Sequence, residues 1–433
     1  IQMFLGLFLL IHSSSSLKFL AHSSQFAKSA VNFNARVCDV LVEAGHEVVI
    51  LAPILDSSIG GVGKTKARVI EIPQCEKARE FEEFATNSGA SNVWRESHPI
   101  SILAGWSGVM DSFLAECNAT LTHPGLIELL RNEQFDVAFT EPSLDYCAPG
   151  LFYLLGIDKW AIMNSLAIVD GDFHFSQMAS NPSYVPTMFG GNMGEEMTFT
   201  QRFNNFLTLL ATEYFFNPYL SKYTELMRQF DPKMPETEEL FSQNSLVFMN
   251  SEPLVDFPRA ISARIIDIGG ISVTGGHKQL NETWSNILNQ RGNNVFISFG
   301  TIAKAYSMPL EYKMSIIRVA KSLPDVTFIW KYEKPEHRIT EGIDNLIEST
   351  WIPQNDLLND HRLSLFVTHC GQGSTTEAIA AGIPLVVIPV AYDQLRNGHQ
   401  VKRNGHGIML NKIDLATPEP LRRAIKEILS NDK

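Results

Sequence analysis

Two parts of the chain repeat the same succession of elements, in which a short buried strand is followed by an amphipathic helix. In the first part, LKFLAH and EVVILAP flank a helical pattern over 31–45, and the strand patterns DVAFTE and WAIMNS follow. In the second part, NVFISFG, TFIWKY, LSLFVTH and PLVVIPV alternate with helical patterns near 309–322, 374–381 and 393–404. Such units build parallel sheets covered by helices. The sequence therefore predicts an α/β fold with two doubly wound, Rossmann-like domains that face a central cleft.

The boundary between these domains is placed where the strand–helix pattern loosens. The chain has 433 residues, a length that suggests two or three domains. We expect an N-terminal domain over 17–265, a linker over 266–294 and a C-terminal domain over 295–433. Residues 170–245 are rich in Phe, Met, Asn and Pro and have weak periodicity. Irregular helices and loops that line an apolar pocket are expected there.

The start of the chain suggests the secretory pathway. Residues 3–11 form an apolar run of nine residues, followed by serines at 13–16, and nine residues are too few to span a bilayer as a helix. The pattern predicts a partial signal peptide over 1–16, with a buried first strand or helix as the alternative. Sequons at Asn118 and Asn281 agree with that compartment. No apolar run of roughly 18 or more residues occurs, so no transmembrane helix is predicted.

Charge and cysteine content exclude several classes of protein. The chain has 35 Lys and Arg residues against 47 Asp and Glu residues, for a net charge of −12, and no basic block. Phosphate neutralisation is then missing, so a nucleic-acid partner is not expected. The five cysteines are too few and too scattered for a disulfide scaffold or a zinc site. Because five is an odd number, at least one is free unless it pairs between chains.

The stretch over 351–411 carries the strongest chemical signal. The predicted strand LSLFVTH ends at His369, and a turn that contains Gly371 and Gly373 opens a helix at Ser374. Helix N-termini hold phosphates because their N–H groups are free and their end carries a partial positive charge. Glycines allow the backbone to approach the anion closely. The order of strand, His, Gly turn and helix predicts a diphosphate site.

Each residue of this stretch also has a structural interpretation. Ser374 and Glu377 match a capping box, which the local pattern favours; otherwise Glu377 accepts hydrogen bonds from sugar or ribose hydroxyls. Asp393 is either a helix cap or, with the adjacent amide, a group that binds vicinal sugar hydroxyls. Trp351 belongs either to the core or to a base-stacking site. His369 alone is more typical of a structural histidine.

The same stretch resembles the signature of the UDP-glycosyltransferase family, which includes the glucuronosyltransferases. The family motif runs W-x-P-Q, T-H-x-G, a Gly/Ser turn, an E in the helix, G-[IV]-P and D-Q. The matching residues are Trp351, Pro353, Gln354, Thr368, His369, Gly371, Gly373, Ser374, Glu377, Gly382, Pro384, Asp393 and Gln394. SFGT at 298–301 and the N-terminal segment VNFNARVCDVLVEAGHEVVILAP also resemble the family. The likeness therefore covers nearly the whole chain.

The resemblance implies a GT-B fold, with a UDP-sugar in the C-terminal domain and a small lipophilic acceptor in the N-terminal domain. The acceptor oxygen would attack the anomeric carbon with inversion, and helix N–H groups would stabilise the leaving UDP without a metal. The UDP-sugar is a substrate, so no cofactor is implied. The family also implies the endoplasmic reticulum lumen and membrane contact through a segment beyond Lys433. The donor sugar (glucuronate or glucose) and the oligomeric state stay open.

By the same resemblance, each motif residue takes a role in donor binding. Trp351 would stack on uracil, Gln354 would contact the nucleoside, and Glu377 would bind ribose. The residues assigned to the diphosphate are Ser298, Thr301, His369, Gly371, Gly373 and Ser374, and those assigned to the sugar hydroxyls are Asp393 and Gln394.

The sequence departs from the family at the residue that removes the acceptor proton. Family members place a His there, in S-H-x-x-F, whereas this chain has Ala30 in SAVNF. The acidic partner of that His corresponds to Glu141 or Asp145, and the sequence does not choose between them. His22 at the end of the first strand is an alternative base with unsuitable spacing. Loss of a general base lowers rates by about 10²- to 10⁴-fold.

Three hypotheses follow from these observations. The first is a UDP-glycosyltransferase with impaired turnover. The second, which Ala30 favours, is a catalytically inactive member that binds a UDP-sugar. The third is another GT-B enzyme, such as a sugar-nucleotide epimerase, and the motif over 351–394 disfavours it.

Overall fold

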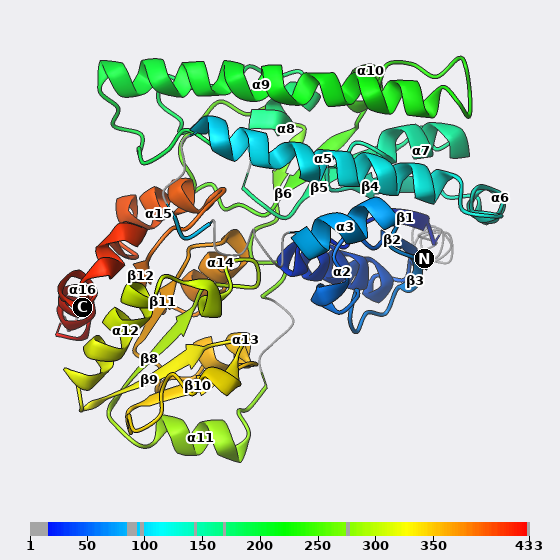
Figure 1. Ribbon diagram of the computed structural model, residues 1–433. Helices are drawn as coiled ribbons and strands as arrows, with labels where there is room; N and C mark the ends of the chain where they lie inside the picture. Colours follow the sequence, from blue (N-terminus) through cyan, green and yellow to red (C-terminus); the bar gives the residue numbers. More distant parts are fainter. Residues whose placement is uncertain are drawn as a thin grey trace, which may run out of the picture.

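The computed structural model describes residues 16–84, 93–95, 99–142, 145–167, 170–273 and 278–430. The chain forms two α/β lobes, each built on one parallel sheet (Figure 1). We call residues 16–273 the N-lobe and residues 278–430 the C-lobe. The signal peptide expected over 1–16 lies, except for Ser16, outside the described residues.

The N-lobe sheet has seven strands among the described residues, in the order β3-β2-β1-β4-β5-β6-β7. The strands are β1 (Lys18–His22), β2 (Glu47–Pro53), β3 (Arg68–Ile72), β4 (Val137–Thr140), β5 (Trp160–Asn164), β6 (Leu246–Met249) and β7 (Ile265–Asp267). The helices are α2 (Lys28–Glu43), α3 (Glu76–Phe84), α5 (Pro99–Leu121), α6 (Leu126–Glu133), α7 (Ala148–Leu155), α8 (Asp170–Phe175), α9 (Phe199–Met227) and α10 (Thr237–Ser242), with a 3₁₀ turn, η1 (Ser57–Ile59).

The C-lobe sheet has six described strands in the order β10-β9-β8-β11-β12-β13. The strands are β8 (Asn293–Ser298), β9 (Val326–Lys331), β10 (Leu346–Ser349), β11 (Leu365–Thr368), β12 (Leu385–Val387) and β13 (Gly407–Met409). The helices are α11 (Glu282–Leu288), α12 (Leu310–Lys321), α13 (Gln354–Leu358), α14 (Gln372–Ala380), α15 (Gln394–Arg403) and α16 (Pro418–Leu429), with 3₁₀ turns η3 (Ala305–Ser307), η4 (Pro335–His337) and η5 (Lys412–Ala416).

Both sheets reverse their direction of growth at the same step of the strand order. In the N-lobe, β1 pairs in parallel with β2 on one side and β4 on the other. In the C-lobe, β8 pairs with β9 and β11. At such a switch point the loops after the two central strands diverge and leave a crevice at their carboxyl ends. The two-domain doubly wound prediction is confirmed, and every strand predicted above is present.

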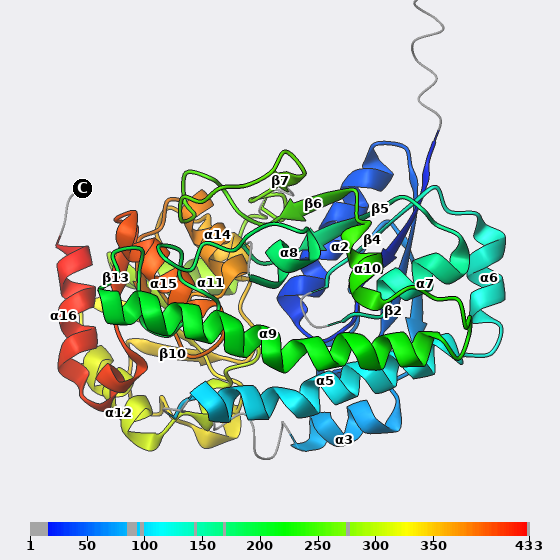
Figure 2. The same cartoon turned by 90° about the horizontal axis from the view of Figure 1, so that it is seen from above.

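The prediction of irregular structure over 170–245 is wrong for its second half. Helix α9 has 29 residues, although it contains Pro218. It begins with a capping box, in which Thr198 accepts from the Gln201 N–H and Gln201 accepts from the Thr198 N–H. Its periodicity is weak because the buried face changes: Phe199 and its neighbours are exposed, whereas residues 219–227 are mostly buried. Figures 1 and 2 show α9 lying along α5.

The stretch 266–294, expected as a linker, also contains regular elements. β7 joins the N-lobe sheet through β6. α11 packs into the C-lobe through Trp284 and Leu288. The strands β3, β6, β7, β10 and β13 were not predicted from the sequence.

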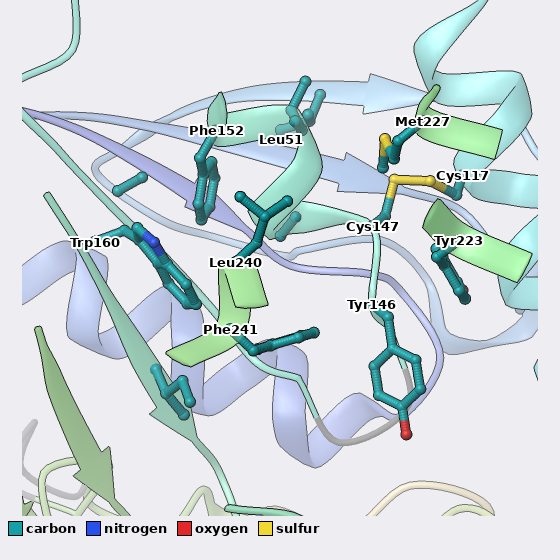
Figure 3. Packing of buried hydrophobic residues seen from close by; sticks show 14 of the residues in the cluster. Leu51, Cys117, Tyr146, Cys147, Phe152, Trp160, Tyr223, Met227, Leu240 and Phe241 are labelled. Atoms are coloured by element: carbon teal, nitrogen blue, oxygen red, sulfur yellow. A yellow bond between two sulfur atoms is a disulfide. The ribbon is translucent and has the colours of Figure 1, made fainter. Parts of the chain in front are cut away.

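A disulfide ties two parts of the N-lobe core together. Cys117 on α5 is bonded to Cys147, which directly precedes α7. Figure 3 shows this bond among buried aromatic residues that include Tyr146 and Tyr223. Cys38, Cys75 and Cys370 are free. The chain thus has one structural bridge rather than a disulfide scaffold.

A tryptophan that precedes α5 is inserted into the hydrophobic core of the C-lobe. Trp94 is fully buried among C-lobe residues and meets the Phe299 ring edge-on at 5.1 Å. Its indole N–H donates to the Lys304 carbonyl at 3.1 Å. The Lys412 ammonium donates to the carbonyls on both sides of Trp94, at 2.8 and 2.7 Å. This segment of the N-lobe sequence is therefore anchored in the C-lobe.

A buried ion pair joins the lobes at a second place. Arg396 on α15 is 2% exposed and contacts the Asp256 carboxylate at 2.5 Å. Asp256, in the loop after β6, also pairs with Arg259. Breaking one partner of a buried pair leaves an uncompensated charge, so this cluster fixes the two lobes against each other.

We expect Trp94→Ala to destabilise the protein strongly, because it opens a cavity in the C-lobe core. Substitutions of buried Trp by Ala typically lower the free energy of unfolding by about 3–5 kcal/mol. Thermal unfolding monitored by circular dichroism measures the effect. Phe199→Ala, which truncates an aromatic side chain that is 84% exposed, is the control. Equal melting temperatures for the two variants would contradict the anchoring role.

Candidate active site

A cavity of about 430 Å³ lies between the lobes and is lined by residues of both. This volume is in the range of small-molecule sites. Its walls come from the loops at the two switch points, because those loops follow the carboxyl ends of β1, β4, β8 and β11. The predicted site residues that line it are Glu141, Asp145, Ser298, Thr301, Gln354, His369, Gly371, Gly373, Ser374, Glu377, Asp393 and Gln394.

Trp351 is placed differently from the other motif residues. Its side chain is 67% exposed, and it does not belong to the cavity lining. The interpretation as a core tryptophan is therefore wrong. The exposed indole of Trp351 is free to stack on a flat ring. It lies outside the cavity that contains the other predicted site residues.

His369 is packed between two glycines at the end of β11. A Cβ atom on Gly300 or Gly371 would lie 2.6 or 2.7 Å from its Nε2 atom. Gly300 also has a φ of +79°, which a residue with a side chain rarely adopts. Burial, followed by the nearby Lys331 ammonium, lowers the pKa of His369 to about 4. At neutral pH this imidazole is therefore uncharged, and it can donate or accept a hydrogen bond.

The helix after His369 begins two residues earlier than predicted. Gly371 is the N-cap of α14 and Gln372 is its first residue. Ser374 consequently lies inside the first turn and cannot be the cap, so the capping-box interpretation is wrong. Its hydroxyl instead accepts from the Gln354 side-chain amide at 3.1 Å. Gly371 supplies no side-chain cap to α14, and a helix N-terminus of this kind can receive an anion.

Gln354 connects α13 with α14. Its amide also donates to the Glu377 carboxylate at 2.7 Å. Burial raises the pKa of Glu377, partly opposed by that hydrogen bond. A carboxylate held in this way on the cavity wall can accept hydrogen bonds from ligand hydroxyls.

Asp393 and Gln394 are fixed at the start of α15. The Gln394 side-chain oxygen accepts from the N–H groups of Val390 and Ala391 at 2.8 and 2.9 Å. Its NH₂ group is the part that can donate to a ligand. Asp393 makes no capping bond and accepts from Asn397 at 2.6 Å. Burial raises the pKa of Asp393 to about 6.

Lys331 is a cavity residue that the sequence analysis did not identify. It ends β9, next to β8, and its ammonium donates to the Gly300 carbonyl at 2.7 Å. Burial lowers its pKa. The sequence did offer one signal for Lys331. It is the last residue of a central strand, and ligand-binding groups in such sheets lie at the carboxyl ends of the strands.

The N-lobe part of the cavity has an aromatic wall. Trp106 of α5 meets Phe189 and, across the lobes, Tyr392 edge-on at 6.1 and 5.2 Å. Phe26 and Phe113 pack at 5.3 Å. Further apolar members are Phe33, Phe175, Met188, Leu209, Phe216 and Leu220. The apolar pocket predicted from residues 170–245 is therefore present, with contributions from α5 as well.

Ala30 lies in the first turn of α2 and lines the same cavity as both predicted carboxylates. Glu141 accepts from the Asn34 amide at 2.9 Å and from the backbone N–H and hydroxyl of Ser165. Asp145 is buried and accepts from the Ser24 hydroxyl and, at 2.9 Å, from the Cys147 N–H. The structure thus brings both carboxylates to one cavity.

His22 is not a cavity residue. It is 3% exposed, its Nδ1 lies 3.7 Å from Asp145, and it does not line the cavity. Burial lowers its pKa, partly opposed by Asp145. A direct role as acceptor base is therefore excluded.

The described residues contain no cluster of His, Cys, Asp and Glu side chains arranged to bind a metal ion. None of their helices combines the length and apolarity that crossing a bilayer requires.

We expect Gly371→Ala to weaken UDP binding about tenfold or more, because the new methyl group would displace the His369 ring. Isothermal titration calorimetry measures the dissociation constant. Gly292→Ala is the matched control, since a Cβ there meets nothing within 4 Å. Similar UDP affinity for both variants would show that the His369 position does not matter.

Asp393→Asn should stabilise the protein at neutral and alkaline pH. Because the folded-state pKa is raised to about 6 from its usual value of 3.8, the folded protein binds more protons than the unfolded chain between these values, and stability falls as pH rises through them. The variant and wild type should have the same melting temperature near pH 4. Above pH 7 the variant should melt at the higher temperature, with a free energy of unfolding about 3 kcal/mol larger. Asp325→Asn, at an exposed position, is the control. A difference in melting temperature that does not change between pH 4 and pH 7, or that Asp325→Asn also shows, would refute the role of Asp393.

Comparisons with known proteins agree with this geometry. Residues 18–433 match the model of the family "UDP-glucoronosyl and UDP-glucosyl transferase". The putative UDP-glucuronosyltransferase ugt-48 of Caenorhabditis elegans is 28% identical, over 96% of this chain and 80% of its own length. Human UDP-glucuronosyltransferase 1A6 is 26% identical, over 92% of this chain and 73% of its own length.

Solved structures establish the fold class. The glycotransferase of kitacinnamycin has a TM-score of 0.64 at 17% identity, with 96% of this chain and 91% of that chain covered. The calicheamicin glycosyltransferase CalG4 has a TM-score of 0.60 at 13% identity, with the same coverage. The fold is GT-B, as predicted. Because the family model spans the chain from the first strand of the N-lobe to its last residue, the chain belongs to the UDP-glucuronosyl and UDP-glucosyl transferase family.

Proposed function

We propose that the chain is an inverting glycosyltransferase that moves glucuronate or glucose from UDP to a hydroxyl of a small lipophilic acceptor. The observation that carries the proposal is one cavity that joins the helix N-terminus of α14 to an aromatic wall. The first suits a diphosphate, and the second suits an apolar acceptor. Membership of the family supports a UDP-sugar as the donor.

We assign the UDP-sugar to the C-lobe, where the chemistry of each side chain suggests which part of the donor it binds. Glu377 and Gln354 would bind the nucleoside and its ribose, with Trp351 stacking on the base. Asp393 and the Gln394 amide would bind the sugar hydroxyls. The groups proposed for the diphosphate are Ser298, Thr301, His369, Gly371, Gly373 and Ser374.

The leaving UDP requires stabilisation of the charge that develops on its β-phosphate. The N-terminus of α14 supplies fixed N–H dipoles, which need no reorganisation when the bond breaks. His369 would donate a hydrogen bond in its uncharged form, since its pKa is lowered to about 4. The transfer is proposed without a metal ion.

The proton of the acceptor must still be removed, and Ala30 has no group that can take it. Glu141 and Asp145 are the proposed catalytic carboxylates, because both line the cavity. Turnover is expected to be slow, since a carboxylate is a weaker base than an imidazole. The alternative is a catalytically inactive UDP-sugar-binding member, which the same Ala30 favours.

We further propose that the protein works in the endoplasmic reticulum lumen and is glycosylated there. The Cys117–Cys147 bond supports an oxidising compartment. The sequon residues Asn118 and Asn281 are both exposed. The acceptor domain is proposed over 17–265 and the donor domain over 295–433, with membrane contact outside these residues.

Ala30→His should raise the turnover number about a hundredfold or more, because it restores a general base beside the carboxylates. UDP affinity should stay unchanged, since donor binding lies in the other lobe. Transfer of labelled sugar from UDP-glucuronate and UDP-glucose to a panel of phenols measures turnover, and calorimetry measures UDP binding.

Ala30→Asn is the matched control, because it fills similar space without a basic nitrogen. An equal rise in both variants would show that bulk, rather than a base, was missing. If the unmodified chain binds UDP but transfers no sugar, the inactive UDP-sugar binder is the correct alternative.

A further inference from the structure

Ser24 and Asp145 both line the cavity, and Ser24 is the more exposed of the two. Ser24 is partly exposed, whereas Asp145 is only 6% exposed. The Ser24 hydroxyl donates to the Asp145 carboxylate. We propose that these two residues replace the missing histidine: the Ser24 hydroxyl receives the acceptor proton and passes its own proton to Asp145. This inference rests on the proposed function.

Strand topology explains why these two residues meet. β1 ends at His22 and β4 at Thr140, and these two residues are paired in the sheet. Ser24 and Asp145 follow those strands, in the loops of the N-lobe switch point, where side chains point into the crevice. The pair therefore lies in the part of the fold that also carries Ala30.

Asp145 is held so that one oxygen faces Ser24. Its Oδ1 accepts from the Cys147 N–H at 2.9 Å, and Cys147 is fixed by its bond to Cys117. Its Oδ2 accepts from Ser24. A carboxylate that is oriented through one oxygen can accept a proton at the other without moving.

The surroundings of Asp145 are also defined. His22 faces the same Oδ2 at 3.7 Å. Glu116 of α5 and Tyr223 of α9 interact with Asp145 electrostatically, and burial raises the pKa of both.

Glu141 is less suited to the same task. One of its oxygens accepts from the Asn34 amide, which carries no proton that can be relayed. The other accepts from the hydroxyl of Ser165, a residue that is 6% exposed and thus less open to a ligand than Ser24. The Ser165–Glu141 pair is therefore a natural comparison for the Ser24–Asp145 pair.

The transfer balances as follows. A bond forms between the acceptor oxygen and the anomeric carbon, while the bond from that carbon to the β-phosphate oxygen breaks and its electron pair leaves with UDP. The acceptor proton moves to the Ser24 oxygen, and the former Ser24 proton moves to Asp145. Exchange with solvent afterwards restores the carboxylate.

The test compares Ser24→Ala, Ser24→Thr and Ser165→Ala with the unmodified chain in sugar transfer. We expect Ser24→Ala to lose about a hundredfold or more in kcat, with UDP affinity unchanged and the protein still folded. Ser24→Thr keeps a hydroxyl and should recover most of the activity. Ser165→Ala should lose clearly less than Ser24→Ala.

A series of acceptors of different acidity adds a readout that a structural role would not move. A weakly acidic alcohol needs its proton removed during attack, whereas an acidic phenol needs less help. The loss in Ser24→Ala should therefore grow as the acceptor becomes less acidic. The added change Ala30→His should restore transfer in the Ser24→Ala background.

The possible failures are distinguishable. If Ser24→Ala keeps normal kcat, or loses the same factor for every acceptor, the relay is wrong while the transferase function stands. If Ser165→Ala loses more than Ser24→Ala, Glu141 is the base. If the unmodified chain transfers no sugar, the proposed function fails and the relay fails with it.

Discussion

Parallel pairing of β1 with β4 and of β8 with β11 is the constraint on which the site depends. Each pairing places the loops after two strands that are distant in sequence at one edge of a sheet. In the C-lobe it brings Ser298 beside Thr368 and so beside His369, and in the N-lobe it brings the β1 loop beside Glu141. The chemistry of the cavity therefore follows from hydrogen bonds between backbones, which no single motif encodes.

Much of this arrangement could be predicted, because strands and motifs leave local signals. The motif over 351–394 supplied eight predicted site residues that line one cavity, the β8 end supplied two more, and the loop after β4 supplied another two. The start of α14 could not be predicted, since Ser374 and Glu377 fit a capping box equally well in sequence. Trp94, Lys331 and Ser24 were missed because their partners are distant in the chain, and only tertiary structure brings them together.

Burial sets the electrostatics of the donor half of the cavity. It lowers the pKa of His369 and raises the pKa of Asp393 and of Glu377. Each change disfavours charge on a group that has to meet a ligand. The fold thus disfavours the charged forms of three groups that line this pocket, a pattern expected where a site is arranged for a ligand rather than for stability.

The Trp94 anchor has a consequence for hybrid proteins. Exchange of one lobe between family members is a natural way to separate acceptor choice from donor choice. Here the N-lobe sequence supplies a core residue of the C-lobe, and Asp256 neutralises an arginine of α15. A crossover placed in 266–294 would pair this C-lobe with a foreign residue at the Trp94 position and a foreign one at the Asp256 position. Chimeras that carry both contacts from one parent are the ones expected to fold.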